Sequence, residues 1–274
     1  MSSLIPIPTL HLFPVLDRLL IEMLRSLSPS DWQKPTVAKL WTVKDVAAHL
    51  LDGNMRAISA MHNHSGKPPQ NINSYPDLVS YLNRLNAVWV EAMDRVSPEQ
   101  ITDMLEATGP EYYQYLSSLD PFAPALYPVA WAGEEQSLNW FHIAREYTEK
   151  WHHQQQIRHA IGSNILLTRE LFYPCITTFI QALPYNYRYV DAPYGTVINI
   201  NITGDVWYLH KHESGWRLIE NFDNGATTTI TIKPEAAWQM FTKALSPQQV
   251  QQHSLIEGNI LLAQQFFSSI AVMA

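Results

Sequence analysis

The chain has 274 residues, of which 46% are hydrophobic, so it is long enough to bury a substantial core in one or two domains. Its net charge of −7 comes from 18 basic and 25 acidic residues without a cationic block, which argues against nucleic-acid binding and against a polybasic membrane anchor. A single cysteine, Cys175, excludes an internal disulfide, and its apolar neighbours predict a buried side chain, so any thiol chemistry would need an external thiol.

The N-terminal segment has no basic residue before Arg18 and contains prolines at positions 6, 8 and 14. A secretory signal instead has a charged start followed by an unbroken apolar run. The longest uncharged stretches, such as 171–187, are interrupted by prolines and polar residues, so no transmembrane helix is predicted. We therefore expect a cytoplasmic protein that does not contact the membrane.

In the first 160 or so residues, apolar side chains recur with helical spacing, which predicts a bundle of four main helices. The helical segments are expected near 9–27, 43–64, 76–95, 98–106 and 137–161. The second of these has Thr42 as N-cap and Asp45 three residues later, which is a variant of the capping box. The last has Ser137 near its start and Gly162 just past its end, which predicts an N-cap and a C′ residue.

After residue 192 the pattern becomes alternating. Ile198, Ile200 and Ile202 fall on one side of an extended segment and asparagines fall on the other, which is typical of a half-buried strand. Further strands are expected at 205–211, 215–220 and 226–233. Together these segments predict a small sheet of three or four strands.

The remaining predicted elements are a bridging helix at 168–183, a turn at 184–187, a helix at 234–244 and a last helix after Gly258 and Asn259 that reaches about residue 272. Helices and strands in separate parts of the chain indicate an α+β protein. The predicted domains are a helical bundle at 1–165, a connecting helix and linker at 166–190, and a small domain of strands and helices at 191–274.

A candidate metal site lies on two of the predicted helices. Glu149 and His153 are four residues apart, so a carboxylate and an imidazole share one helix face. His49 lies about a hundred residues upstream at the border of an apolar stripe, and a bundle can bring all three side chains around one ion. Two imidazoles and one carboxylate suit Zn²⁺, with Ni²⁺ and Fe²⁺ as alternatives, and leave coordination positions open.

Each of these residues also has an explanation without a metal. A histidine beside an apolar stripe, such as His49, is more often a core or boundary residue bonded to the backbone. Glu149 and His153 also suit a solvated helix face, as a pair worth only about 0.2–0.5 kcal/mol. The helix also carries His152 and His159, which gives it more histidines than a metal site needs, so we expect some of these histidines not to bind the metal.

Two runs of the sequence resemble a known family. The segments 31–50 (DWQKPTVAKLWTVKDVAAHL) and 149–162 (EKWHHQQQIRHAIG) are similar to the paired signatures of the DinB-like superfamily, in its mycothiol-dependent maleylpyruvate isomerase branch. The resemblance implies metal ligands at His49, Glu149 and His153, in a DinB-like bundle followed by a sterol-carrier-like domain. Supporting motif positions are Trp32, Pro35, Trp41, Val43 and Asp45. At one position the chain departs from the family pattern, because Gln156 replaces an acidic residue and removes a charge beside the second motif's histidine.

The resemblance implies an enzyme that uses a divalent metal and a low-molecular-weight thiol on a small, electrophilic, maleylpyruvate-like substrate. Either cis–trans isomerisation or S-transfer fits this chemistry, and the motifs specify neither the thiol nor the substrate. An alternative of a different class is a non-enzymatic stress protein that binds a metal or an apolar ligand. Arg217 could clamp a substrate carboxylate, but its place on a predicted strand favours an exposed charge.

Overall fold

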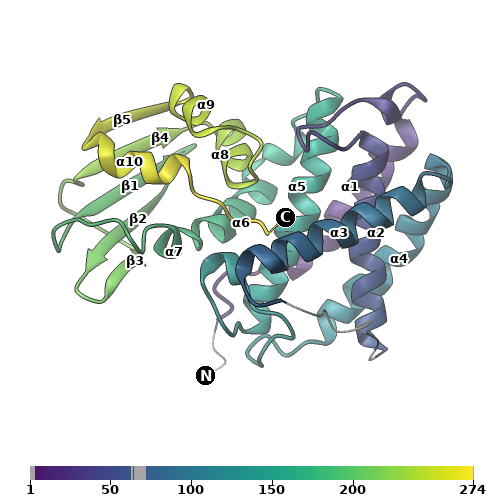
Figure 1. Cartoon of the computed structure of the whole chain (residues 1–274), viewed down its shortest axis with the longest axis horizontal. Coiled ribbons are helices and arrows are strands. Elements are labelled where there is room, and N and C mark those ends of the chain that lie inside the picture. Colours follow the sequence, from purple (N-terminus) through teal and green to yellow (C-terminus); the bar gives the residue numbers. More distant parts are fainter. Residues whose placement is uncertain (1–3, 63, 65–71, 274) are drawn as a thin grey trace. The chain divides into compact units, whose positions relative to one another are not determined.

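The computed structural model in Figure 1 describes residues 4–62, 64 and 72–273, which form two compact units. The first unit comprises Met1–Pro124, Leu138–Leu166 and Met273–Ala274, and the second comprises Ala125–Ser137 and Leu167–Val272. Along the sequence, the chain therefore leaves the first unit at Ala125, returns at Leu138 and leaves it again at Leu167. Among the helices described, none combines the length and the hydrophobicity that crossing a lipid bilayer requires.

The first unit is helical, as predicted. Its main helices are α1 (Phe13–Ser26), α2 (Val43–Met61), α3 (Tyr75–Met93), α4 (Pro98–Ser118) and α5 (Asn139–Ala160). Residue 63, inside the predicted range 43–64, lies outside the described residues, and α2 ends at Met61. The predicted end of the fourth helix at residue 106 is wrong, because α4 continues through Pro110. Burial of Tyr112 and Leu116 beyond this proline keeps the last turns of α4 against the bundle.

The core of this unit holds α2 in place. Helix α2 packs against α3, α4 and α5, and α1 packs against α4. Val46 of α2 is buried in one cluster with Leu24 of α1, Leu105 of α4 and Ile157 of α5. Fully burying an apolar side chain of this size stabilises the fold by about 1.5–3 kcal/mol. The cluster therefore fixes the face of α5 that carries Ile157 against α2.

The start of α2 is the predicted capping box. The Oγ1 of Thr42 accepts a hydrogen bond from the Asp45 backbone N–H at 3.3 Å, and the Thr42 N–H donates to the Asp45 carboxylate at 2.9 Å. Thr42→Ala is expected to lower the free energy of unfolding by about 0.5–2 kcal/mol, because it leaves a helix-terminal N–H without its acceptor. Urea unfolding measures this loss, and Thr42→Ser, which keeps the hydroxyl, is the control. Equal stability of the alanine variant and wild type would contradict a stabilising cap.

The two predicted caps of α5 differ in outcome. Gly162 follows the helix with a φ of +78°, the left-handed conformation expected at C′, so that prediction is confirmed. Ser137 as N-cap is wrong, because α5 begins at Asn139 and Leu138 is its N-cap. The Ser137 hydroxyl instead accepts from the Val129 N–H at 2.8 Å and donates to the carboxylate of Glu134. The side chain is thus engaged within the preceding loop.

The second unit contains the sheet. Its strands are β1 (Val197–Ile202), β2 (Asp205–His212), β3 (Gly215–Ile219), β4 (Thr228–Ile232) and β5 (Ser254–Gly258), in the order β3-β2-β1-β4-β5. β1 pairs with β4 in parallel, and the other neighbours are antiparallel. The helices are α6 (Arg169–Ile180), α7 (Leu183–Asn186), α8 (Pro234–Phe241), α9 (Pro247–Gln252) and α10 (Ile260–Phe267). The sequence predicted neither β5 nor α9.

Burial explains most of the agreement in this unit. Ile198, Ile200 and Ile202 are buried on one face of β1, as their alternation predicts, and Cys175 is fully buried on α6. Arg217 is exposed on β3 and donates a hydrogen bond to Ser214, which agrees with an exposed strand charge. Asn259 caps α10 as expected, with its side-chain oxygen accepting from the Leu261 N–H at 3.0 Å.

Three boundaries in this unit were predicted wrongly. The segment 184–187 was expected to be a turn, but it lies mostly in α7, where Leu183 is fully buried. The helix at 234–244 ends at Phe241, and the last helix ends at Phe267 instead of near residue 272. Tertiary burial, which residue propensity does not report, fixes these ends.

The segment Ala125–Ser137 packs on α7. Gly133 has a φ of +81°, and a Cβ atom there would lie 2.2 Å from a ring carbon of Tyr185, so only glycine permits this approach of the backbone to the ring. Trp131 and Val129 are buried in the same segment. The segment is therefore an integral part of the second unit, although residues of the first unit flank it on both sides along the chain.

Candidate metal site

The first sequence motif builds the loop that leads into α2. Pro35 and Thr42 form an isolated antiparallel bridge, and the N–H and hydroxyl of Thr36 donate to the Trp41 carbonyl at 3.0 and 2.8 Å. Trp32 is buried in the core cluster of the bundle. These contacts fix the backbone of Trp41 immediately before α2, one residue ahead of the capping box.

The three predicted ligands come together in the first unit. His49 on α2 and Glu149 and His153 on α5 each offer one donor atom, and these atoms all lie within 4.8 Å of one another. Nε2 of His153 lies 3.4 Å from a carboxylate oxygen of Glu149. His153 is only 8% exposed, so the alternative of a solvated helix face is wrong for this residue.

Two aromatic groups enclose the imidazoles. The indole of Trp41 lies 4.8 Å from the His49 ring and 6.4 Å from the His153 ring, measured between centroids. On another side, the His152 ring lies 3.9 Å from that of His153 and donates from Nδ1 to the Thr148 carbonyl at 2.7 Å. The sequence identified Trp41 as a motif position but not its contact with the two histidines, which depends on the fold of the preceding loop.

Gln156 contacts His153 from the next turn of α5. Its side-chain oxygen Oε1 lies 2.9 Å from Nδ1 of His153, and both residues are buried. Nδ1 therefore donates to the amide oxygen, which leaves the Nε2 lone pair directed toward Glu149. The three-residue spacing between His153 and Gln156 was visible in the sequence. The hydrogen bond was not predicted, because Gln156 was interpreted only as the loss of an acidic residue.

The protonation states suit metal ligands. Burial, together with the neighbouring His153, holds the pKa of His49 well below its ordinary value, so this imidazole is neutral at pH 7. Burial alone would raise the pKa of Glu149, but nearby positive charge, including that of Arg145, outweighs this effect and lowers the pKa. A neutral imidazole and an ionised carboxylate are the forms that bind a divalent cation.

Two observations show that the donor set fits such a cation. The buried Nδ1 of His49 has no hydrogen-bond partner within the described chain, which is costly unless another species satisfies it. The facing Nε2 of His153 and oxygen of Glu149 are both acceptors and lie 3.4 Å apart. Two ligands bound about 2.1 Å from a tetrahedral Zn²⁺ would also lie about 3.4 Å apart.

A polar network lies one helical turn before Glu149. Nη2 of Arg145 donates to Nδ1 of His142 at 2.8 Å and to the Glu146 carboxylate at 2.5 Å. The hydroxyl of Tyr112 on α4 donates to the other oxygen of Glu146 at 2.6 Å. Sequence reasoning missed this network, although the four-residue spacing between His142 and Glu146 was a signal for it. Its hydrogen bonds connect α4 to the part of α5 that precedes the metal ligands.

The network makes stability depend on pH through His142. Burial, opposed by Glu146 and reinforced by Arg145, lowers the pKa of His142 from 6.5 to about 4. Between these values the unfolded chain binds a proton that the folded chain does not, so the free energy of unfolding falls as the pH decreases. His142→Gln is expected to reduce the slope of the unfolding free energy against pH by up to the equivalent of one bound proton, between about pH 6.5 and 4. Urea unfolding at a series of pH values measures the slope, and an unchanged slope in the variant would show that His142 does not cause it.

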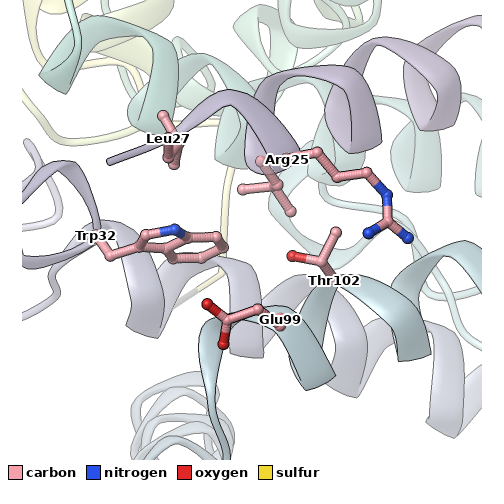
Figure 2. A pocket seen from close by; sticks show the side chains of 6 residues that line it. Arg25, Leu27, Trp32, Glu99 and Thr102 are labelled. Carbon is pink, nitrogen blue, oxygen red and sulfur yellow. The ribbon is translucent and has the colours of Figure 1, made fainter. Parts of the chain in front are cut away.

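A separate hollow of about 310 Å³ lies beside the buried Trp32, between α1 and α4. Figure 2 shows the guanidinium of Arg25 pointing away from the indole, and this group pairs with Asp103 at 3.0 Å and with Glu106. The side chain of Thr102 donates to a carbonyl of its own helix. The polar groups of Arg25 and Thr102 are thus already engaged, and the three predicted metal ligands are not among the residues that line this hollow in the described chain.

Comparison with known families agrees with the geometry. The family model described as the mycothiol maleylpyruvate isomerase N-terminal domain matches residues 14–158, which are just over half of the chain and include all three donors. No curated protein matches the chain. The match covers α1 to α5 nearly completely, so it concerns the helical unit.

Three solved structures are similar to the chain. A variant of the mycothiol-dependent maleylpyruvate isomerase matches with a TM-score of 0.51 and 10% identity, covering 84% of this chain and 86% of that chain. It confirms the predicted fold class, a helical N-terminal part followed by a sheet with helices. The unmodified isomerase matches over the same shares at 10% identity with a TM-score of 0.48. The UbiJ-SCP2 ubiquinone synthesis protein matches at 17% identity over 35% of this chain and 89% of that chain, with a TM-score of 0.26, which is too low to establish a shared fold.

Proposed function

The chain belongs to the family of the mycothiol maleylpyruvate isomerase N-terminal domain, and from this membership we propose that it is a metal-dependent enzyme that uses a low-molecular-weight thiol. Its substrate is a small electrophile with a conjugated double bond, similar to maleylpyruvate. The single observation that carries the proposal is the meeting of His49, Glu149 and His153 within 4.8 Å in the family's own domain.

His49, Glu149 and His153 would hold the metal, and three protein ligands leave room for a further one. A divalent metal bound there would act as a Lewis acid and lower the pKa of a coordinated thiol, so that thiolate forms near neutral pH. Burial keeps the pKa of His49 low, so its ring is neutral, and the hydrogen bond to Gln156 places a proton of His153 on Nδ1, on the side away from Glu149. Trp41 covers these rings on one side.

Two reaction outcomes follow from a thiolate held next to a conjugated double bond. In isomerisation, sulfur adds to one carbon of the double bond, rotation occurs about the new single bond, and elimination releases the thiol and the other geometric isomer. In S-transfer, the carbon–sulfur bond remains and the neighbouring carbon takes up a proton. Family membership favours isomerisation, in which the thiol is regenerated and acts as a cofactor.

The test uses the full-length protein, purified and then divided into metal-loaded and chelator-treated portions. Each portion is assayed with maleylpyruvate and a panel of thiols that includes mycothiol and glutathione, and both isomer ratio and thiol consumption are measured. We expect turnover only when metal and thiol are both present, with little consumption of thiol for an isomerase. Stoichiometric consumption would indicate S-transfer. Metal binding without thiol-dependent turnover for any thiol in the panel would contradict the enzyme and support a metal-binding protein.

A further inference from the structure

Gln156 occupies a special position beside the candidate metal site. Its Oε1 atom accepts a hydrogen bond from Nδ1 of His153 at 2.9 Å, and the two side chains are buried, with residue exposures of 5% and 8%. A neutral imidazole carries its proton on only one nitrogen. A hydrogen bond that holds the proton on Nδ1 therefore keeps Nε2 unprotonated, and Nε2 is the nitrogen that faces Glu149.

We propose that Gln156 is a positioning residue of the metal site, which fixes the tautomer and the ring orientation of His153 so that Nε2 points at the ion. This inference rests on the proposed metal-dependent function. Histidine ligands of metals commonly donate their second N–H to a carbonyl or carboxylate, and loss of that partner typically weakens metal binding by about 10–100-fold. Here the acceptor is a side-chain amide from the same helix, one turn away.

The uncharged amide also sets the charge of the site. A divalent ion held by one carboxylate, Glu149, and two neutral imidazoles leaves a net charge of about +1. An acidic residue at position 156, which the sequence motif would otherwise carry, would bring that sum to about zero. With the amide at position 156, the site is expected to bind the metal less tightly than it would with a carboxylate there, and it keeps a positive charge that favours an incoming thiolate.

The neighbouring Gln155 provides a matched control. It lies on the same buried stretch of α5, is 1% exposed, and neither atom of its amide has a hydrogen-bond partner in the described structure. Replacing Gln155 with methionine removes an amide of the same size at the same depth without removing a contact to His153. Any general effect of losing a buried glutamine from this helix is therefore measured separately from the effect on His153.

The experiment measures the Zn²⁺ dissociation constant of the full chain by competition with a chromogenic chelator, for wild type, Gln156→Met, Gln156→Glu and Gln155→Met. We expect Gln156→Met to bind Zn²⁺ about 10–100-fold more weakly than wild type, and Gln155→Met to match wild type. Gln156→Glu keeps the acceptor and adds a charge, so it is expected to bind Zn²⁺ more tightly than wild type.

The outcomes separate this inference from the proposed function. Wild-type affinity in Gln156→Met, or weaker binding in Gln156→Glu, would overturn the positioning role while leaving the metal site intact. Thermal unfolding in excess chelator shows whether each variant is folded before metal is added. If Gln156→Met does not fold, the comparison of Gln156→Glu with wild type decides the result by itself. Absence of Zn²⁺ binding by wild type would instead contradict the proposed function, and the positioning role would fall with it.

Discussion

Replacing His153 with alanine is expected to weaken Zn²⁺ binding by at least about 100-fold and to reduce thiol-dependent turnover to the uncatalysed rate. The change removes one of three converging donors, and it leaves Glu149 without the neighbour that lies 3.4 Å from its carboxylate. Loss of a direct ligand should weaken Zn²⁺ binding more than any change to a surrounding hydrogen bond does. Metal content after dialysis and the rate of isomerisation with the active thiol are the two measurements.

His159→Ala is the matched control, because it removes an imidazole from an exposed position on the same helix. We expect its metal content and turnover to equal those of wild type. Retention of both metal and activity in His153→Ala would disprove the proposed site. Loss of activity with metal fully retained would show that His153 acts in the reaction without binding the ion.

The second large effect is expected at a buried ion pair between α1 and α5. Nζ of Lys150 lies 3.0 Å from the carboxylate of Asp17, with side-chain exposures of 6% and 19%, and it also lies 4.8 Å from the ring centre of Tyr112. Asp17→Ala would leave a buried ammonium without its counter-ion. The free energy of unfolding is expected to fall by about 3–5 kcal/mol, as measured by urea unfolding.

Two controls test whether the unpaired charge causes this loss. The double variant Asp17→Ala with Lys150→Met removes both charges and is expected to regain most of the stability. Arg18→Ala breaks a pair with Glu22 whose side chains are 61% and 59% exposed, and it should cost no more than about 1 kcal/mol. If Asp17→Ala lowers the free energy of unfolding no more than Arg18→Ala does, the ion pair between Asp17 and Lys150 does not contribute the stability that its burial implies.

The parts of the site that the sequence predicted are those encoded locally. Thr42 and Asp45 form a cap within four residues, and Glu149 and His153 share a face because of helix geometry. That His49 joins them depends on how α2 packs against α5, which no short-range pattern specifies. The resemblance to a known family supplied that pairing, and the structure brings the three donors within 4.8 Å.

The features that the sequence did not predict depend on distant contacts. β5 is a short edge strand in which Leu255 is 62% exposed, so its hydrophobic pattern does not distinguish it from a loop. α4 passes through Pro110, a residue that usually ends or bends a helix, because the residues beyond it are buried. The amide of Gln156 was interpreted as a missing charge, whereas its oxygen makes the contact itself.

The close approach of Tyr185 to Gly133 has a consequence for the order of folding during synthesis. The segment Ala125–Ser137 is translated before Leu138–Leu166, yet its packing partner α7 emerges from the ribosome later. The helical unit is expected to close first, with this segment as a tethered loop that docks once Tyr185 has been made. A recombinant fragment that stops at Leu166 would expose Trp131, so truncation just behind the metal ligands should yield a protein prone to aggregation.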